Sequence, residues 1–127
     1  VTTPEPTAIT DAYGIIKIIA TEIDNLSLSL KLIVNRVKSV TEGKKVAERV
    51  INIASQFLNL KVDYLGYVYE DQAVHQSVLR QKPFLVNDPK GKASACVQHI
   101  VGRLEKIDYK EGGGIGQFIK KLFGASE

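Results

Sequence analysis

Apolar residues recur at helical spacing in three long segments of the chain. The pattern predicts helices over 7–24, 44–59 and 92–107, each with one apolar stripe and with charged residues on the remaining surface. Two shorter apolar runs, at 28–34 and 62–68, predict buried strands, the first of them buried on both faces. Helices and strands therefore alternate, which favours an α/β fold with a parallel sheet flanked by helices.

The segments between these elements are shorter. Residues 73–80 predict a brief helix, 83–86 an extended piece and 87–91 a turn, while Val1–Thr3 fit the last residues of a preceding strand. Two parallel strands alone leave both sheet edges open, and strands this apolar are normally buried among neighbours. We therefore expect the chain to be the second half of a larger α/β domain, or to pair with the missing half.

The composition fits one soluble domain. The chain has 127 residues, of which 44% are hydrophobic and 24% charged, and it contains no run typical of a secretory signal or a transmembrane helix. It lacks an initiator methionine, so we expect a truncated start. The single cysteine excludes an internal disulfide, and two histidines are too few for a zinc site. We expect a cytosolic protein whose net charge of +3 permits an anionic partner without requiring one.

Two glycine-containing segments, 88–94 and 112–117, were compared with phosphate-binding loops, and both depart from the pattern. For the first segment, the Gly91-Lys92 pair would require the leading glycine of the motif at position 86, which is Val86. The second ends in Gln117 where the dinucleotide-binding pattern requires glycine, and no strand precedes it. If the protein handles a nucleotide, this chain as a whole lines the base side of the binding site and does not supply the phosphate site.

No catalytic constellation is visible from residue types. His75 and His99 fit surface or interface positions, and Cys96 fits the core stripe of the last helix. Glu70 and Asp71 form the only adjacent acidic pair, and we interpret this pair as a cap for the following helix and not as an acid/base pair.

The end of the chain carries a separate signal. Residues 108–114 contain three successive glycines and predict a flexible linker. Residues 115–127 follow, and their first part predicts an amphipathic helix with apolar and basic sides. We expect this helix to bind a membrane surface through the apolar Ile115, Phe118, Ile119, Leu122 and Phe123 and the basic Lys120 and Lys121. The alternative is a terminal helix that folds back onto the domain.

Four segments carry a family resemblance: Thr2–Tyr13, Leu32–Val37, Leu65–Val74 and Gln81–Phe84. In order and spacing they resemble the MinD/ParA group of deviant Walker A ATPases, and within it the flagellar-number regulators known as FlhG or FleN. The resemblance implies that residues 1–107 are the C-terminal half of a MinD-like P-loop NTPase domain. It also implies that the terminal amphipathic helix is a membrane-targeting sequence.

The resemblance further implies an ATP-dependent switch that regulates flagellar number or placement. Such a protein dimerises with bound nucleotide and attaches to the inner face of the cytoplasmic membrane. Its expected partners are the missing N-terminal half, a second copy, an anionic membrane and a flagellar GTPase or regulator. ATP and Mg²⁺ are expected in the full-length protein. The phosphate loop and magnesium ligands are absent here, so this chain is not expected to bind nucleotide stably or to act as an ATPase alone.

By matching positions, the resemblance assigns five residues to the adenine side of the site: Asn35, Arg36, Tyr69, Glu70 and Asp71. Asn35 would hydrogen-bond the adenine edge, and the loop from Tyr69 to Asp71 would close over the base. An amide side chain can both donate to and accept from adenine, which agrees with this role.

Two other classes of function stay open. In a ParA-like partition protein, DNA would contact the basic residues near the second helix, which are Lys38, Lys44, Lys45 and Arg49. Glu42 and Glu48 interrupt these basic residues, so we favour a solvated helix face and do not expect DNA binding. In a non-enzymatic scaffold, the terminal helix would dock into a groove of a partner protein.

Overall fold

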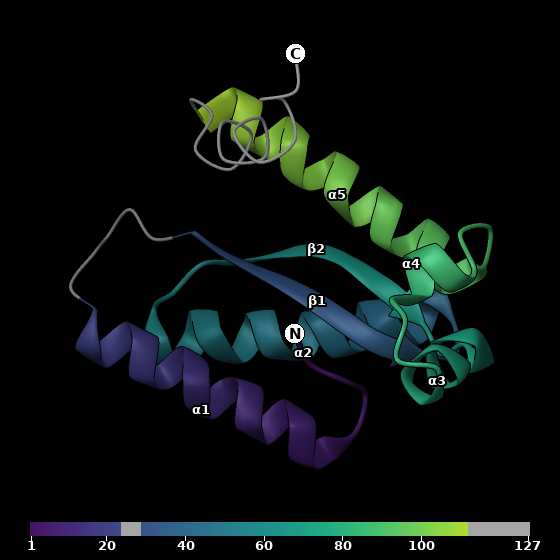
Figure 1. Ribbon diagram of the computed structural model, residues 1–127. Helices are drawn as coiled ribbons and strands as arrows, with labels where there is room; N and C mark the ends of the chain where they lie inside the picture. The colour runs from purple at the N-terminus through teal and green to yellow at the C-terminus, as the bar shows by residue number, and fades with distance from the viewer. Residues whose placement is uncertain (24–28, 112–127) are drawn as a thin grey trace.

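The protein has an α/β fold in which two parallel strands are flanked by helices, as the sequence predicts (Figure 1). The computed structural model describes residues 1–23 and 29–111. In chain order the elements are α1 (Pro6–Glu22), β1 (Leu30–Val37), α2 (Val40–Leu58), β2 (Val62–Tyr69), α3 (Gln72–Leu79), α4 (Phe84–Asn87) and α5 (Lys92–Glu111).

The chain's first residues add a third position to the sheet. The Thr2 N–H donates to the carbonyl of Ile33 at 2.9 Å, and the Asn35 N–H donates to the carbonyl of Thr2 at 2.7 Å. Thr2 is buried and pairs in parallel with Val34. The sequence predicts Val1–Thr3 as the last residues of a preceding strand, and at Thr2 the structure shows strand-like parallel pairing with β1.

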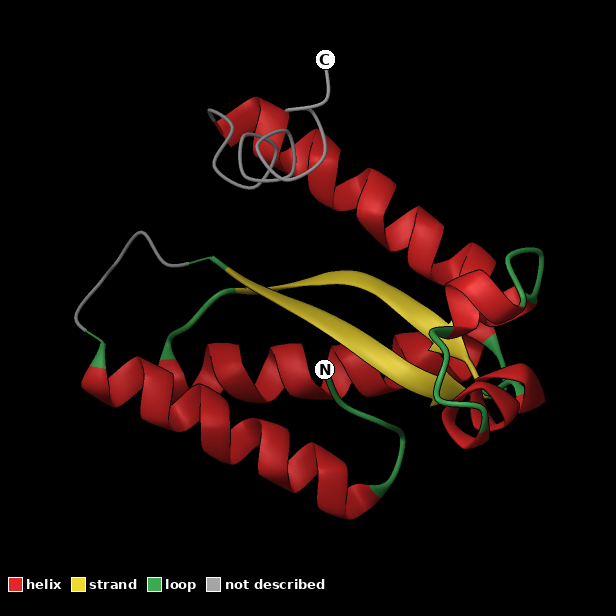
Figure 2. Cartoon of the chain, in the orientation of Figure 1, coloured by secondary structure: helices red, strands yellow, loops and turns green. Residues whose placement is uncertain are grey.

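Helices cover both faces of the sheet. Figure 2 shows α1 and α2 on one face, α5 on the other, and α3 and α4 near the carboxyl ends of the strands. The core between the sheet and the α1–α2 layer consists of Ile9, Ile16, Leu32, Val34, Val37, Val46, Ala47, Val50, Ala54 and Val62. The core on the α5 face consists of Leu65, Val68, Ala93, Cys96 and Ile100. The predicted burial of β1 on both faces is complete only toward α1 and α2; toward α5, Ile33 is half-buried.

Several predicted boundaries differ from the structure. β1 continues to Val37, and α2 begins at Val40 because the Ser39 hydroxyl caps it by accepting from the Glu42 N–H at 3.1 Å. The segment at 83–86, predicted as extended, instead forms the one-turn helix α4, for which Pro83 provides a compatible entry. α5 continues past the predicted end at 107 to Glu111, and so takes in the first positions assigned to the linker.

Close packing joins β2 to α5. Gly66 has no side chain, and a Cβ atom there would lie 2.8 Å from Cγ1 of Ile100. Leu65 lies at a register irregularity of the sheet, and its carbonyl accepts a hydrogen bond from Nη1 of Arg103 at 2.9 Å. Both contacts fix α5 against the face of β2.

A buried hydroxyl lies under α2. The Tyr64 hydroxyl has no hydrogen-bond partner among the described residues, and burial raises the pKa of this phenol. A Cβ atom on Gly43 would lie 2.9 Å from this hydroxyl and 3.3 Å from Cγ1 of Val37. Glycine is therefore required at this position by space, although it lies inside a helix.

We predict that Gly43→Ala lowers the free energy of unfolding by about 1–2 kcal/mol, because overpacking outweighs the higher helix propensity of alanine. Tyr64→Phe alone should be nearly neutral, because it removes a hydroxyl that makes no hydrogen bond. In the Tyr64→Phe background, Gly43→Ala should lower the free energy of unfolding much less, because the hydroxyl that the new Cβ meets is gone. Urea denaturation of the four proteins measures this coupling, and equal losses in both backgrounds would contradict it.

Candidate functional site

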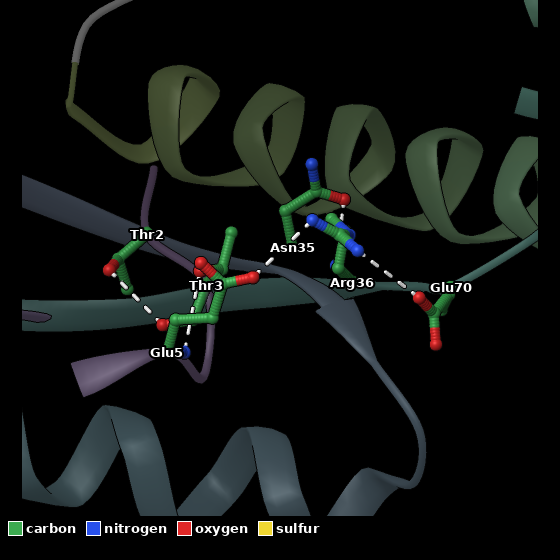
Figure 3. Close-up of polar contacts among 6 residues, drawn as sticks. All are labelled: Thr2, Thr3, Glu5, Asn35, Arg36 and Glu70. Atoms are coloured by element: carbon green, nitrogen blue, oxygen red, sulfur yellow. Dashed lines mark hydrogen bonds and ion pairs between the residues drawn. The ribbon is translucent and has the colours of Figure 1, made fainter. Parts of the chain in front are cut away.

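The candidate site lies where the two strands reach their carboxyl ends. The Glu70 N–H donates to the carbonyl of Val37 at 2.9 Å, which places the residue after β2 beside the end of β1. The Arg36 guanidinium lies between two carboxylates, with Nη2 at 3.3 Å from Glu70 and Nη1 at 3.5 Å from Glu5 (Figure 3). The structure therefore brings together Arg36 and Glu70, two of the candidate adenine-side residues, and adds Glu5 from the segment before α1.

These ion pairs position the segments more than they stabilise the fold. The side chains of Arg36, Glu5 and Glu70 are 57%, 61% and 48% exposed, so each pair contributes at most about 1 kcal/mol. Three segments far apart in the sequence nevertheless meet through one guanidinium. Glu5 could not be identified from local sequence, because only the folded sheet brings it next to Arg36.

The end of β1 has an unusual backbone. Arg36 has a φ of 59°, in the left-handed region that non-glycine residues rarely adopt, and it lies at a register shift between Val34 and Val37. The Asn35 side-chain oxygen accepts a hydrogen bond from the Arg36 N–H at 2.9 Å. This bond orients the Asn35 side chain, whose amide NH₂ can donate to a ligand.

Tyr69 belongs to β2 and not to the following loop, which corrects the predicted boundary. It pairs in register with Val37, and its ring packs against both cores. The Tyr67 and Tyr69 rings meet edge to face, with centroids 5.2 Å apart. Tyr69 is therefore a wall residue held by packing.

Asp71 binds the first turns of two helices. Its Oδ1 accepts from the Ala73 N–H of α3 at 3.0 Å, and its Oδ2 accepts from the Ala93 N–H of α5 at 3.1 Å. These two backbone hydrogen bonds, with a smaller contribution from Lys92, hold the pKa of this carboxyl below its ordinary value. The predicted cap of the following helix is confirmed for Asp71, whereas its bond to α5 is not visible from local sequence.

The segment 88–94, which departs from the phosphate-loop pattern, is occupied by its own hydrogen bonds. The buried Ser94 hydroxyl contacts two carbonyl oxygens, those of Asp88 at 2.6 Å and Phe84 at 3.4 Å. The Gly91 N–H also donates to the Asp88 carbonyl at 3.1 Å. The segment is therefore a turn that fastens α4 to α5. The segment 112–117 lies outside the described residues.

The other candidate residues have simple positions. His75 and His99 are exposed and Cys96 is buried in the α5 core, as predicted. Within residues 1–23 and 29–111, no three His, Cys, Asp or Glu side chains gather as metal ligands, and none of the helices there has the length and apolarity needed to cross a membrane. The basic residues considered for DNA are all exposed: Lys38, Lys44, Lys45 and Arg49. The candidate membrane-binding residues 115–123 lie outside the part of the chain that the structure describes.

Comparisons with known proteins identify two relatives. The chain is 27% identical over 120 residues to the antiactivator FleN of Pseudomonas aeruginosa, which covers 93% of this chain and 42% of FleN. It is 34% identical over 130 residues to the flagellum site-determining protein YlxH of Helicobacter pylori, which covers 96% of this chain and 42% of YlxH. The chain thus spans less than half the length of either relative. No protein-family model matches it. The resemblance to flagellar-number regulators of the MinD/ParA type is confirmed by these matches.

The lowered pKa of Asp71 predicts a specific acid sensitivity. A carboxyl whose pKa is lower in the folded protein than its ordinary 3.8 stabilises the fold above that value, and this stabilisation is lost as the pH falls through the folded-state pKa. The free energy of unfolding should therefore fall less between about pH 5 and pH 2 in Asp71→Asn than in the unchanged protein. Chemical denaturation at a series of pH values measures the difference. Parallel pH profiles would show that Asp71 does not carry this linkage.

Proposed function

We propose that this chain is the adenine-side part of an ATP-dependent regulator of flagellar number or placement. The observation that carries the proposal is the convergence of Asn35, Arg36 and Glu70 at the carboxyl ends of two parallel strands. Ligands of parallel α/β sheets bind beyond this edge. Both relatives carry names of flagellar regulators, an antiactivator and a site-determining protein, which supports the same process.

The residues of this edge have distinct roles in the proposal. Asn35 donates from its amide NH₂ to a ring nitrogen of adenine, while its oxygen accepts from the Arg36 N–H and orients the side chain. Arg36 and Glu70 hold the two strand ends at a fixed separation, and Tyr69 provides an aromatic wall. The phosphate loop, the Mg²⁺ ligands and the water-activating group for hydrolysis come from the remainder of the ATPase domain.

Two surfaces of the chain suit that remainder. Thr2 leaves its far side free for further parallel strands, since its hydrogen bonds to β1 use only one side of the backbone. On α1, Ile15 and Ile18 are 60% and 61% exposed, which is unusual for isoleucines of a small domain. A larger domain would cover both features. ATP hydrolysis and nucleotide-dependent dimerisation are therefore proposed for the complete protein and not for this chain alone.

The adenine role is tested with Asn35→Asp in a protein that joins this chain to the phosphate-binding part. A carboxylate cannot donate to a ring nitrogen, so ATP binding should weaken about tenfold or more, with less change for GTP. The control is Asn52→Asp, which makes the same chemical change at an exposed position of α2. Isothermal titration with ATP and GTP measures both. Unchanged ATP affinity in Asn35→Asp would contradict the assignment.

We also propose that the residues after the glycine-rich segment anchor the protein to an anionic membrane. The support is the sequence pattern, in which Phe118 and Phe123 share one side of a helical projection and Lys120 and Lys121 lie on the other. A single short amphipathic helix binds weakly, and two helices in a dimer bind more strongly through effective concentration.

Co-sedimentation with liposomes tests the anchor. Phe118→Ala combined with Phe123→Ala should reduce binding to anionic vesicles at least about tenfold, because each buried aromatic ring contributes about 2 kcal/mol or more. Phe57→Ala is the matched control, because Phe57 is 71% exposed on α2 and far from the terminal helix in sequence. Equal losses in both variants, or no binding by the intact protein, would favour the scaffold that docks onto a partner protein.

A further inference from the structure

The first turn of α5 depends on an acceptor from outside the helix. Gly91 is the residue before α5, and its carbonyl accepts the helical hydrogen bond from the Ala95 N–H at 3.0 Å. Glycine has no side-chain acceptor for the free amides of a helix start. A Cβ atom at Gly91 would also collide with the Asp88 carboxylate, which would have to move to admit a capping side chain there. The Ala93 N–H is bound instead by Asp71, which lies 22 positions earlier in the sequence.

The same carboxylate belongs to the loop that follows β2. Asp71 directly follows Glu70, whose backbone is bound to Val37 and whose side chain is paired with Arg36. A continuous set of hydrogen bonds and ion pairs therefore runs from the end of β1, through Glu70 and Asp71, to the first turn of α5. Each Asp71 oxygen accepts one helix amide, one from α3 and one from α5, so this single carboxylate joins the first turns of both helices.

We infer that Asp71 is a positioning residue that couples the nucleotide loop to α5, so that a base bound at Asn35, with the loop after β2 closed over it, orders the first turn of α5. This inference rests on the proposed function. It revises the role that the resemblance implies for Asp71: the residue does not touch the base but fixes the loop that does. A ligand that immobilises Glu70 restricts Asp71, and the restricted carboxylate then holds the Ala93 amide more persistently.

The chemistry of asparagine separates the two helices. Asparagine is among the best residues for capping its own helix, so Asp71→Asn should keep the bond to Ala73 of α3. Its amide has only one oxygen, and the NH₂ group cannot accept from the Ala93 N–H. Asp71→Asn should therefore release α5 alone. Asp11→Asn is the matched control, because it removes the same charge from an exposed position of α1.

The experiment is amide hydrogen exchange in a protein that joins this chain to the phosphate-binding part, with and without ATP. Without ATP, exchange at Ala93 should be about fivefold faster in Asp71→Asn, while Ala73 changes little, as expected for the loss of one cap. In the unchanged protein and in Asp11→Asn, ATP should slow exchange at Glu70 and also at Ala93. In Asp71→Asn, ATP should still slow exchange at Glu70 but no longer at Ala93.

Each result separates the coupling from the proposed function. ATP-dependent protection of Ala93 that persists in Asp71→Asn would overturn the coupling while leaving the nucleotide site intact. Loss of ATP binding in Asp71→Asn would also overturn the inference, because it would place Asp71 in direct contact with the nucleotide. If ATP protects neither Glu70 nor Ala93 in the unchanged protein, the proposed adenine site fails and the inference fails with it.

Discussion

The parallel pairing of β1 with β2 is the constraint on which the remaining structure depends. It places both strands' carboxyl ends at one edge of the sheet, where Arg36 and Glu70 become neighbours although they are far apart in sequence. Parallel strands also need a crossover connection, and here that connection is α2. This helix follows β1 and precedes β2 in the chain and packs on one face of the sheet. The candidate site is thus a consequence of strand direction before it is a consequence of particular side chains.

Much of the fold could be predicted from local patterns. The long helices have apolar stripes, and the strands are short apolar runs, so their existence and order follow from periodicity. The errors fall where contacts between distant residues set the local structure. The segment after Pro83 forms a helical turn next to Asp88, whose carbonyl accepts from the Ser94 hydroxyl. Tyr69 belongs to β2 because it pairs with Val37. Such contacts join residues whose proximity local sequence does not reveal.

The candidate site shows the same division. Asn35, Arg36 and Glu70 could be named in advance because they lie at or just after the carboxyl ends of strands and match a family pattern. Glu5 and the bond from Asp71 to Ala93 could not, because each joins separate elements. For the bond from Asp71 to Ala93, the sequence does contain one clue, which is Gly91 before α5. A helix that starts after a glycine lacks a local cap, and its first amides require an acceptor from elsewhere in the fold.

If the proposed function is right, the carboxyl edge of the sheet, and not another surface of this chain, meets adenine. Backbone NMR of a protein that joins this chain to the phosphate-binding part tests it most directly, with ATP added to the magnesium-loaded protein. We expect the largest backbone chemical-shift changes within this chain to occur at Asn35, Arg36 and 69–71. Changes centred instead on the amino ends of the strands, around 59–63, or absent from this chain altogether, would contradict it.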